Sequence, residues 1–179
     1  NDSVQVVEQL KKMGIVSVMI TGDSKDGAKT ISGKVGIETY YYRVLPDQKA
    51  DIVKSFKKKG ITMMVGDGIN DAPSLATADV GIAMGKGTDI AIESADVVLM
   101  RGQLSRLVSF IRLSRKTLWV IRENLFWAFI YNVLGIPIAF GVLYPFFNIR
   151  LEPMYGALAM MISSVSVVTN CLRLRFFKE

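Results

Sequence analysis

Two short glycine-containing segments carry oxygen-bearing side chains that could take part in phosphate chemistry. Thr21-Gly22-Asp23 follows the apolar run VMI, and GDGIND, residues 66–71, follows MMV. In the second segment, Asp67 and Asp71 are four residues apart and Asn70 precedes Asp71. Two carboxylates and an amide oxygen are hard ligands of the kind that Mg²⁺ prefers. The spacing therefore predicts a Mg²⁺ site formed by Asp67 and Asp71, with Asn70 beside it.

A hydroxyl, a bare N–H and a cation could complete such a site. Thr21 offers its hydroxyl and Gly22 its backbone N–H to phosphoryl oxygens. Lys49 follows Pro46 near the start of an expected helix and could neutralise the transferred charge. Phosphoryl transfer needs these parts because its catalysis is mostly positioning and charge stabilisation. Single Thr-Gly or Asp-Gly pairs are usually turns, but their order here, with Lys49 between them, favours phosphoryl transfer.

The first hundred residues alternate between helical and strand-like patterns. We predict helices over 3–13, 25–35, 47–58, 71–78 and 88–95. We predict strands over 15–20, 39–44, 61–65, 80–84 and 96–100. This alternation favours a Rossmann-like α/β fold, a parallel sheet with helices on its faces. Sites in such sheets form at the carboxyl ends of strands, which is where both glycine-containing segments lie.

The composition excludes several other kinds of site. The 179 residues include no histidine and a single cysteine, Cys171. Catalysis that needs histidine, a cysteine-based zinc cluster and an intrachain disulfide are therefore excluded. The net charge of +6 is unevenly divided, because residues 1–100 carry −1 and residues 101–179 carry +7. A protein that coats nucleic acid would not divide its charge in this way, so no nucleic-acid partner is predicted.

Two long uncharged runs predict a transmembrane hairpin. Residues 125–144 are 20 consecutive uncharged residues, and residues 154–172 are 19. At 1.5 Å per residue such helices are about 30 Å long, which is the thickness of a hydrocarbon core. Basic residues flank the pair on both outer sides, whereas the connecting segment has Arg150 alone. The positive-inside rule then places both ends in the cytoplasm, and a buried soluble hairpin is the alternative.

Polar and sulfur-containing side chains in these runs could bind a transported ion. Tyr131 and Asn132 lie in the first run, and Met160 and Ser164 lie one turn apart in the second. A thioether suits Cu⁺, and neither run has the carboxylate or amine that harder ions would need. The alternative is that methionine packs and that serine serves helix contact. We expect Cys171 to be a small packing residue, with a further copper contact as its alternative role.

Essentially the whole chain resembles P-type ATPases. The resemblance rests on MITGD, VLPDQKADIVK and MVGDGINDAPSLATADVGIAMGKGTDIAIESADVVLM, which look like the second half of the phosphorylation domain. It implies a haloacid-dehalogenase-like fold, ATP as substrate and an Asp nucleophile in a DKTGT motif. No DKTGT occurs in this chain, so we expect the nucleophile, the nucleotide-binding domain and the actuator domain before Asn1. The resemblance also implies that Thr21, Gly22 and Lys49 hold the phosphoryl group and that Asp23 is a positioning or hinge residue.

Within that family, the chain is similar to the copper(I)-exporting subgroup. Tyr131 and Asn132 in the penultimate helix and Met160 and Ser164 in the last match its pattern, and the Lys and Asp of Zn²⁺ and Cd²⁺ relatives are absent. A Cys-Pro-Cys pair would lie in an earlier helix, and these residues do not distinguish Ag⁺ from Cu⁺. The resemblance implies a multi-pass protein in the lipid bilayer of the plasma (inner) membrane, with a copper chaperone as a further partner to consider.

The sequence predicts six parts. They are the second half of a phosphorylation domain (1–102), a basic cytoplasmic stalk helix (103–124), a transmembrane helix (125–144), an extracytoplasmic loop (145–153), a second transmembrane helix (154–172) and a cytoplasmic tail (173–179). We expect the first residue to be a cut into a longer protein and the piece alone to be inactive. The alternatives are a membrane-anchored Mg²⁺-dependent phosphatase and a non-enzymatic chain that pairs with an intact pump.

Overall fold

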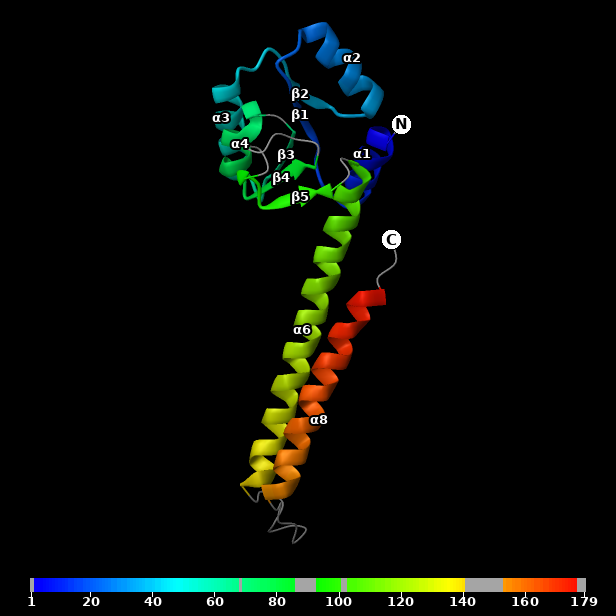
Figure 1. The fold of residues 1–179 in the computed structure, drawn as a ribbon, viewed down its shortest axis with the longest axis vertical. Helices are drawn as coiled ribbons and strands as arrows, with labels where there is room; N and C mark the ends of the chain where they lie inside the picture. The colour runs from blue at the N-terminus through cyan, green and yellow to red at the C-terminus, as the bar shows by residue number, and fades with distance from the viewer. Residues whose placement is uncertain (1, 68, 86–92, 101–102, 141–152, 177–179) are drawn as a thin grey trace. The chain divides into compact units, whose positions relative to one another are not determined.

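The computed structural model describes residues 2–67, 69–85, 93–100, 103–140 and 153–176. The chain forms two compact units, Asn1–Ser109 and Phe110–Glu179. In the described residues the first unit is built of strands and helices and the second of helices (Figure 1).

The α/β unit contains two parallel sheets (Figure 1). One pairs β1 (Val18–Ile20) with β2 (Thr39–Tyr41). The other has the order β3–β4–β5 and consists of β3 (Met63–Gly66), β4 (Val80–Met84) and β5 (Val97–Leu99). The parallel strands confirm the predicted α/β class, but in the described residues they form two sheets rather than the one that we expected.

Helices alternate with these strands. They are α1 (Asp2–Lys12), α2 (Lys25–Val35), α3 (Pro46–Lys57), the 3₁₀ turn η1 (Ile69–Asp71) and α4 (Ala72–Thr77). α2 has clear end signals, because the Gly27 N–H donates to the Ser24 hydroxyl at 3.3 Å and Gly36 follows the helix with a φ of 78°. α3 begins at a proline, whose missing N–H costs nothing at the first helical position. The helix predicted over 88–95 lies mostly outside the described residues.

The strand predicted over 15–20 is shorter in the structure. Gly14 adopts a φ of 75°, and the Ile15 N–H donates to the Leu10 carbonyl oxygen at 2.9 Å. This arrangement caps the C-terminus of α1, and the next residues connect the helix to the strand. β1 therefore begins at Val18.

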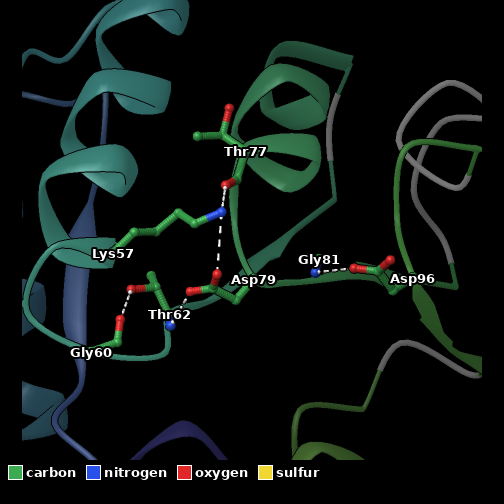
Figure 2. Close-up of polar contacts among 7 residues, drawn as sticks. All are labelled: Lys57, Gly60, Thr62, Thr77, Asp79, Gly81 and Asp96. Carbon is green, nitrogen blue, oxygen red and sulfur yellow. Dashed lines mark hydrogen bonds and ion pairs between the residues drawn. The ribbon is translucent and has the colours of Figure 1, made fainter.

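The core of the α/β unit includes the contact between α4 and β4. Ile82 and Ala83 of β4 are fully buried, and Leu75 of α4 is 1% exposed. A Cβ on Gly81 would lie 2.6 Å from the Leu75 carbonyl oxygen, so the helix and the strand pack backbone against backbone. The Gly81 N–H also donates to Asp96 Oδ2 at 2.8 Å, which ties the strand to the segment before β5 (Figure 2).

A group of polar contacts holds the start of β4 (Figure 2). The Thr62 N–H donates to Asp79 Oδ2 at 2.8 Å, and the Asp79 N–H donates to the Thr62 carbonyl oxygen at 2.9 Å. Lys57 Nζ lies 3.2 Å from Asp79 Oδ1 and donates to the Thr77 carbonyl oxygen at 2.8 Å. The hydrogen bond from Thr62, and after it the Lys57 ammonium, lower the pKa of Asp79 below its ordinary value.

We expect Asp79→Asn to reduce the acid sensitivity of the α/β unit. A carboxyl group whose pKa is lowered by folding stabilises the folded state above its ordinary value of about 3.9, and this contribution is lost as the pH falls through the lowered value. Between about pH 5 and pH 2, the wild-type chain should lose more stability than the variant. Urea denaturation followed by circular dichroism measures the difference.

Asp51→Asn is the control for this comparison, because Asp51 is an exposed carboxylate on the neighbouring helix α3. It should keep the acid sensitivity of the wild type. If Asp79→Asn loses stability as steeply as the wild type does, the contact between Asp79 and Thr62 does not stabilise the start of β4.

The helical unit is built on two long helices. α6 (Ser105–Ala139) starts in the α/β unit and continues unbroken into the helical unit, where α8 (Pro153–Leu172) and the 3₁₀ turn η3 (Arg173–Phe176) follow. In the part of the chain that the structure describes, no helix combines the length and the apolar character needed to cross a bilayer. The predicted span 125–144 continues past α6 into residues 141–144, which lie outside the described part, as does most of the predicted loop. The transmembrane hairpin therefore stays a prediction.

Candidate functional site

Lys49 and Asp71 form an ion pair. Lys49 Nζ lies 2.7 Å from Asp71 Oδ1, and the two side chains are 16% and 12% exposed. Lys49 comes from the first turn of α3, where its N–H donates to the Leu45 carbonyl oxygen at 3.2 Å, and Asp71 ends η1 just before α4. A buried ion pair is costly to break, because removal of one partner leaves the other charge uncompensated. The structure thus joins two residues that the sequence places separately at the predicted phosphoryl site.

The carboxyl end of β3 approaches Asp71 closely. A Cβ on Gly66 would lie 2.7 Å from Asp71 Cβ and 3.0 Å from Asp71 Oδ2. Glycine is needed at this position because a larger residue would push the carboxylate away from the strand. Asp67 and Asn70 lie on the exposed surface between these two residues.

The side chains of this segment fit a Mg²⁺ site that is completed by other ligands. Mg²⁺ usually takes one or two carboxylates together with water and substrate phosphate oxygens. Asp67 and Asp71 offer two carboxylates within five residues, and Asn70 adds an amide oxygen. Within the described residues, no three His, Cys, Asp or Glu side chains gather into a group that could hold a metal ion by themselves. Two carboxylates and an amide oxygen suit a site that water and phosphate oxygens complete.

The turn that follows β1 is ordered by hydrogen bonds. The Asp23 N–H donates to Thr21 Oγ1 at 3.1 Å, and the Ser24 N–H donates to Asp23 Oδ1 at 2.7 Å. From the neighbouring segment, the Arg43 N–H donates to the Asp23 carbonyl oxygen at 2.9 Å. Arg43 has a φ of 51°, so the chain leaves the extended conformation and β2 ends before the predicted strand does. Gly22 lies exposed within this turn.

The predicted site residues therefore form two groups. One group lies after β1 and contains Thr21, Gly22 and Asp23, and the other lies after β3 or on α3 and contains Lys49, Asp67, Asn70 and Asp71. Among the described residues, no hydrogen bond or ion pair joins the two groups. They follow strands of different sheets, and in the same part of the chain β1 and β3 each pair with a strand on one side only.

In the helical unit, the residues predicted to bind copper interact with their own helices. Asn132 Nδ2 donates to a backbone carbonyl one turn earlier at 3.0 Å, and the Ser164 hydroxyl donates to the Met160 carbonyl oxygen at 3.1 Å. The ring of Tyr131 lies 6.5 Å from that of Trp127, between centroids. The Met160 side chain is 70% exposed. In the described residues these contacts do not join the four side chains into one cluster.

A polar cluster between α6 and α8 was not anticipated from the sequence. Asn124 Nδ2 donates to Cys171 Sγ at 3.1 Å, and Asn170 Nδ2 donates to Asn124 Oδ1 at 2.8 Å. Asn170 Nδ2 also lies 3.4 Å from Glu123 Oε2, and Arg173 Nη1 donates to Asn170 Oδ1 at 2.9 Å. The available signal was the pair of asparagines near the outer ends of the two uncharged runs, but it becomes informative only when the helix register is known.

Several known proteins are similar to this chain. A family model of haloacid dehalogenase-like hydrolases matches residues 1–79. A probable copper-transporting ATPase, PacS, of Synechocystis is 53% identical over 176 residues, which cover 98% of this chain and 24% of the relative. A copper-exporting P-type ATPase of Legionella pneumophila is 52% identical, with 96% and 23% covered. The crystal structure of a zinc-transporting PIB-type ATPase in the E2·Pi state is 34% identical with a TM-score of 0.86, over 97% of this chain and 27% of that one. The chain thus spans about a quarter of the length of each of these three proteins.

We expect Lys49 and Asp71 to be energetically coupled. Lys49→Met and Asp71→Leu should each lower the free energy of unfolding by about 2 kcal/mol, because each leaves one charge without its partner. The double variant should be more stable than the sum of these losses implies, by about 1 kcal/mol or more. Urea denaturation of the whole chain, followed by circular dichroism, gives the four values of the cycle.

The exposed pair between Lys11 and Glu38 provides the matched control. Its charged atoms lie 3.1 Å apart, but the two side chains are 73% and 86% exposed. Lys11→Met should therefore change the stability by about 0.5 kcal/mol or less. Additive losses for Lys49→Met and Asp71→Leu would mean that the close pair contributes nothing beyond its separate residues.

Proposed function

We infer that this chain is a segment of a copper-transporting P-type ATPase and that its α/β unit is the second half of the phosphorylation domain. The observation that carries this inference is the 53% identity over 98% of the chain, because the alignment extends through both units. The family model and the solved structures agree on a haloacid-dehalogenase-like α/β unit. The chain spans 24% of that relative, so the activity belongs to the longer protein. That activity is ATP-driven export of Cu⁺ or Ag⁺ through an aspartyl phosphate.

Lys49 is suited to hold the phosphoryl group. An ammonium group has three N–H donors, and the ion pair with Asp71 Oδ1 uses one of them. Two donors are then left for phosphoryl oxygens. Thr21 and Gly22 supply a hydroxyl and a backbone N–H, and Asp23 positions both by holding the turn through its hydrogen bonds.

Asp67 and Asp71 are the residues that would hold Mg²⁺, with Asn70 beside them. Bound Mg²⁺ supplies positive charge that stabilises the transferring phosphoryl group. The close approach of Gly66 keeps the Asp71 carboxylate at the end of β3, and the exposed position of Asp67 leaves its oxygens accessible to a ligand from solvent. Lys49 lies against the same carboxylate, so the phosphoryl-binding cation and the metal-binding oxygens share one place in the fold.

The nucleophilic Asp lies in a segment that precedes this chain in the longer protein. In the described residues, β1 and β3 belong to different sheets and each is paired on one side only. A strand inserted between them would join the two sheets and bring together the two groups of site residues. That strand would carry the DKTGT motif, and the nucleotide-binding and actuator domains would be the further partners within the same protein.

The helical unit forms the last membrane helices of the pump. The uncharged runs 125–144 and 154–172 would cross the bilayer, with the loop 145–153 outside and the tail 173–179 in the cytoplasm. Residues 103–124 would be a stalk that couples the α/β unit, residues 1–102, to these spans. The support for this division is the uncharged length of the two runs together with their basic flanks.

Copper is favoured over zinc as the transported ion, although the solved structure cited above is of a zinc-transporting protein. The two runs contain no carboxylate, amine or imidazole, so they lack charged or nitrogen ligands for a harder ion. Met160 brings a soft thioether, and Tyr131, Asn132 and Ser164 bring polar oxygens. The relatives that are about 52% identical are named as copper transporters, which agrees with this donor set.

The Mg²⁺ assignment is tested in the full-length protein by phosphorylation from ATP. Asp67→Ala and Asp71→Asn should each abolish the acid-stable phosphoenzyme at limiting Mg²⁺, because the phosphoryl charge is not stabilised without the cation. Asp71→Asn is preferred to alanine because it can still accept a hydrogen bond from Lys49. Asp51→Ala is the matched control and should be phosphorylated as the wild type is. Wild-type phosphoenzyme levels in Asp67→Ala or Asp71→Asn would refute the assignment.

The copper assignment is tested by Met160→Leu, which keeps the volume of the side chain but removes its sulfur. We expect Cu⁺-stimulated ATPase activity to fall strongly, whereas Met161→Leu, about 100° around the helix, should have little effect. Phosphorylation by inorganic phosphate needs no bound copper and should survive both changes. If Met160→Leu exports Cu⁺ as well as the wild type does, Met160 is a packing residue.

A further inference from the structure

The polar cluster between α6 and α8 gives the register of the two helices. Figure 1 shows the two helices antiparallel, with α8 returning beside the second half of α6. Asn124 is bonded to both Asn170 and Cys171, at 2.8 Å and 3.1 Å. In an antiparallel pair, each step away from this contact along α6 is matched by an equal step back along α8.

The same register brings two of the proposed copper residues to one depth. Tyr131 lies seven residues beyond Asn124, and Ser164 lies seven residues before Cys171. Seven residues rise about 10 Å and return to the same helix face within about 20°. Tyr131 and Ser164 therefore lie at one depth, two turns beyond the contact between Asn124 and Cys171, and the same count from Asn170 leads to the neighbouring Ser163. Met160 lies one more turn beyond Ser164.

We propose that Asn124 and Asn170 form a clamp that sets this register and thereby holds Tyr131 and Ser164 at one depth for copper. Asn132 and Ser164 bond to their own backbones, so these side chains do not set the alignment of the helices. Van der Waals packing alone tolerates sliding between apolar helices, whereas an amide pair with matched donors and acceptors does not. Both asparagines are positioning residues, and this role rests on the proposed transport function.

Glu123 and Arg173 support the clamp from its two sides. Arg173 Nη1 donates to Asn170 Oδ1 at 2.9 Å, and Glu123 Oε2 lies 3.4 Å from Asn170 Nδ2. The amide oxygen of Asn170 thus faces a guanidinium and its amide nitrogen faces a carboxylate, so the amide is held in one orientation. The contacts of Asn170 Nδ2 with Glu123 and Asn124 are part-buried, so the loss of a partner there is more costly than it would be in open water.

The register is tested by cross-linking in the intact pump. Tyr131→Cys and Ser164→Cys are introduced together with Cys171→Ser, and the disulfide between positions 131 and 164 is measured by mass spectrometry after mild diamide oxidation. The pair should cross-link readily, and adding Asn170→Leu should lower the yield several-fold. Thr169→Val is the control, because the Thr169 hydroxyl donates to a backbone carbonyl of its own helix at 2.8 Å. This change should leave the yield unchanged. An equal yield with and without Asn170→Leu, or no cross-link in either, overturns the clamp.

The role in copper binding is tested by the same Asn170→Leu change in the pump with its native cysteine and tyrosine. The half-saturating Cu⁺ concentration for ATPase stimulation should rise by about tenfold, as is usual when a residue that orients metal ligands is lost. Phosphorylation by inorganic phosphate should remain, which separates this effect from misfolding. A reduced cross-link with unchanged Cu⁺ dependence would overturn the positioning role. Absence of Cu⁺ stimulation in the wild type would instead overturn the proposed function, while the cross-link still decides the register.

Discussion

The ion pair between Lys49 and Asp71 is the contact on which the predicted phosphoryl site depends. It connects the first turn of α3 to the turn that follows β3, across 22 positions of sequence. Both side chains are largely removed from water, so each charge is tolerable only because the other is 2.7 Å away. The proposed phosphoryl site is therefore built around charges that are already balanced in the absence of a phosphoryl group.

The two units use different kinds of polar contact to hold their elements in position. In the α/β unit, a buried charge pair and a close glycine contact fix where a carboxylate lies relative to a strand end. In the helical unit, a hydrogen bond between the amides of Asn124 and Asn170, with Glu123 and Arg173 beside it, joins two helices. Charge balance suits a site for anions and Mg²⁺, whereas neutral hydrogen bonds suit an apolar medium in which charged pairs are expensive. The kind of polar contact in each unit thus follows from the surroundings that its proposed function requires.

The predictable parts of the fold are those encoded by neighbouring residues. Ser24 and Gly36 mark the ends of α2, and the alternation of helices and strands gives the parallel α/β class. Local pattern was less informative where distant segments meet. Arg43 leaves the β conformation where its N–H donates to the Asp23 carbonyl oxygen, and the residues around it do not reveal this contact.

The candidate site likewise has features that the sequence predicts and features that it does not. The identity of its residues could be inferred from order and chemical type, because turns at strand ends are local features. The pairing of Lys49 with Asp71 depends on how α3 packs beside η1, and the pairing of Asn124 with Asn170 depends on the helix register. Neither contact can be derived from spacing along the chain. The family resemblance gave the proposed identity of the segment, with which the similar relatives agree, but it did not give these contacts.

The contact between Gly81 and Leu75 also limits which sequences this fold accepts. Position 81 lies in the central strand of its sheet, directly opposite Met64 of β3. A methyl group at this position meets a backbone carbonyl oxygen, which cannot rotate away as a side chain can. The displacement would spread through β4 to both neighbouring strands and so to the turn that holds Asp67. Substitution of Gly81 should thus impair the proposed site through the backbone, although Gly81 itself carries no reactive group.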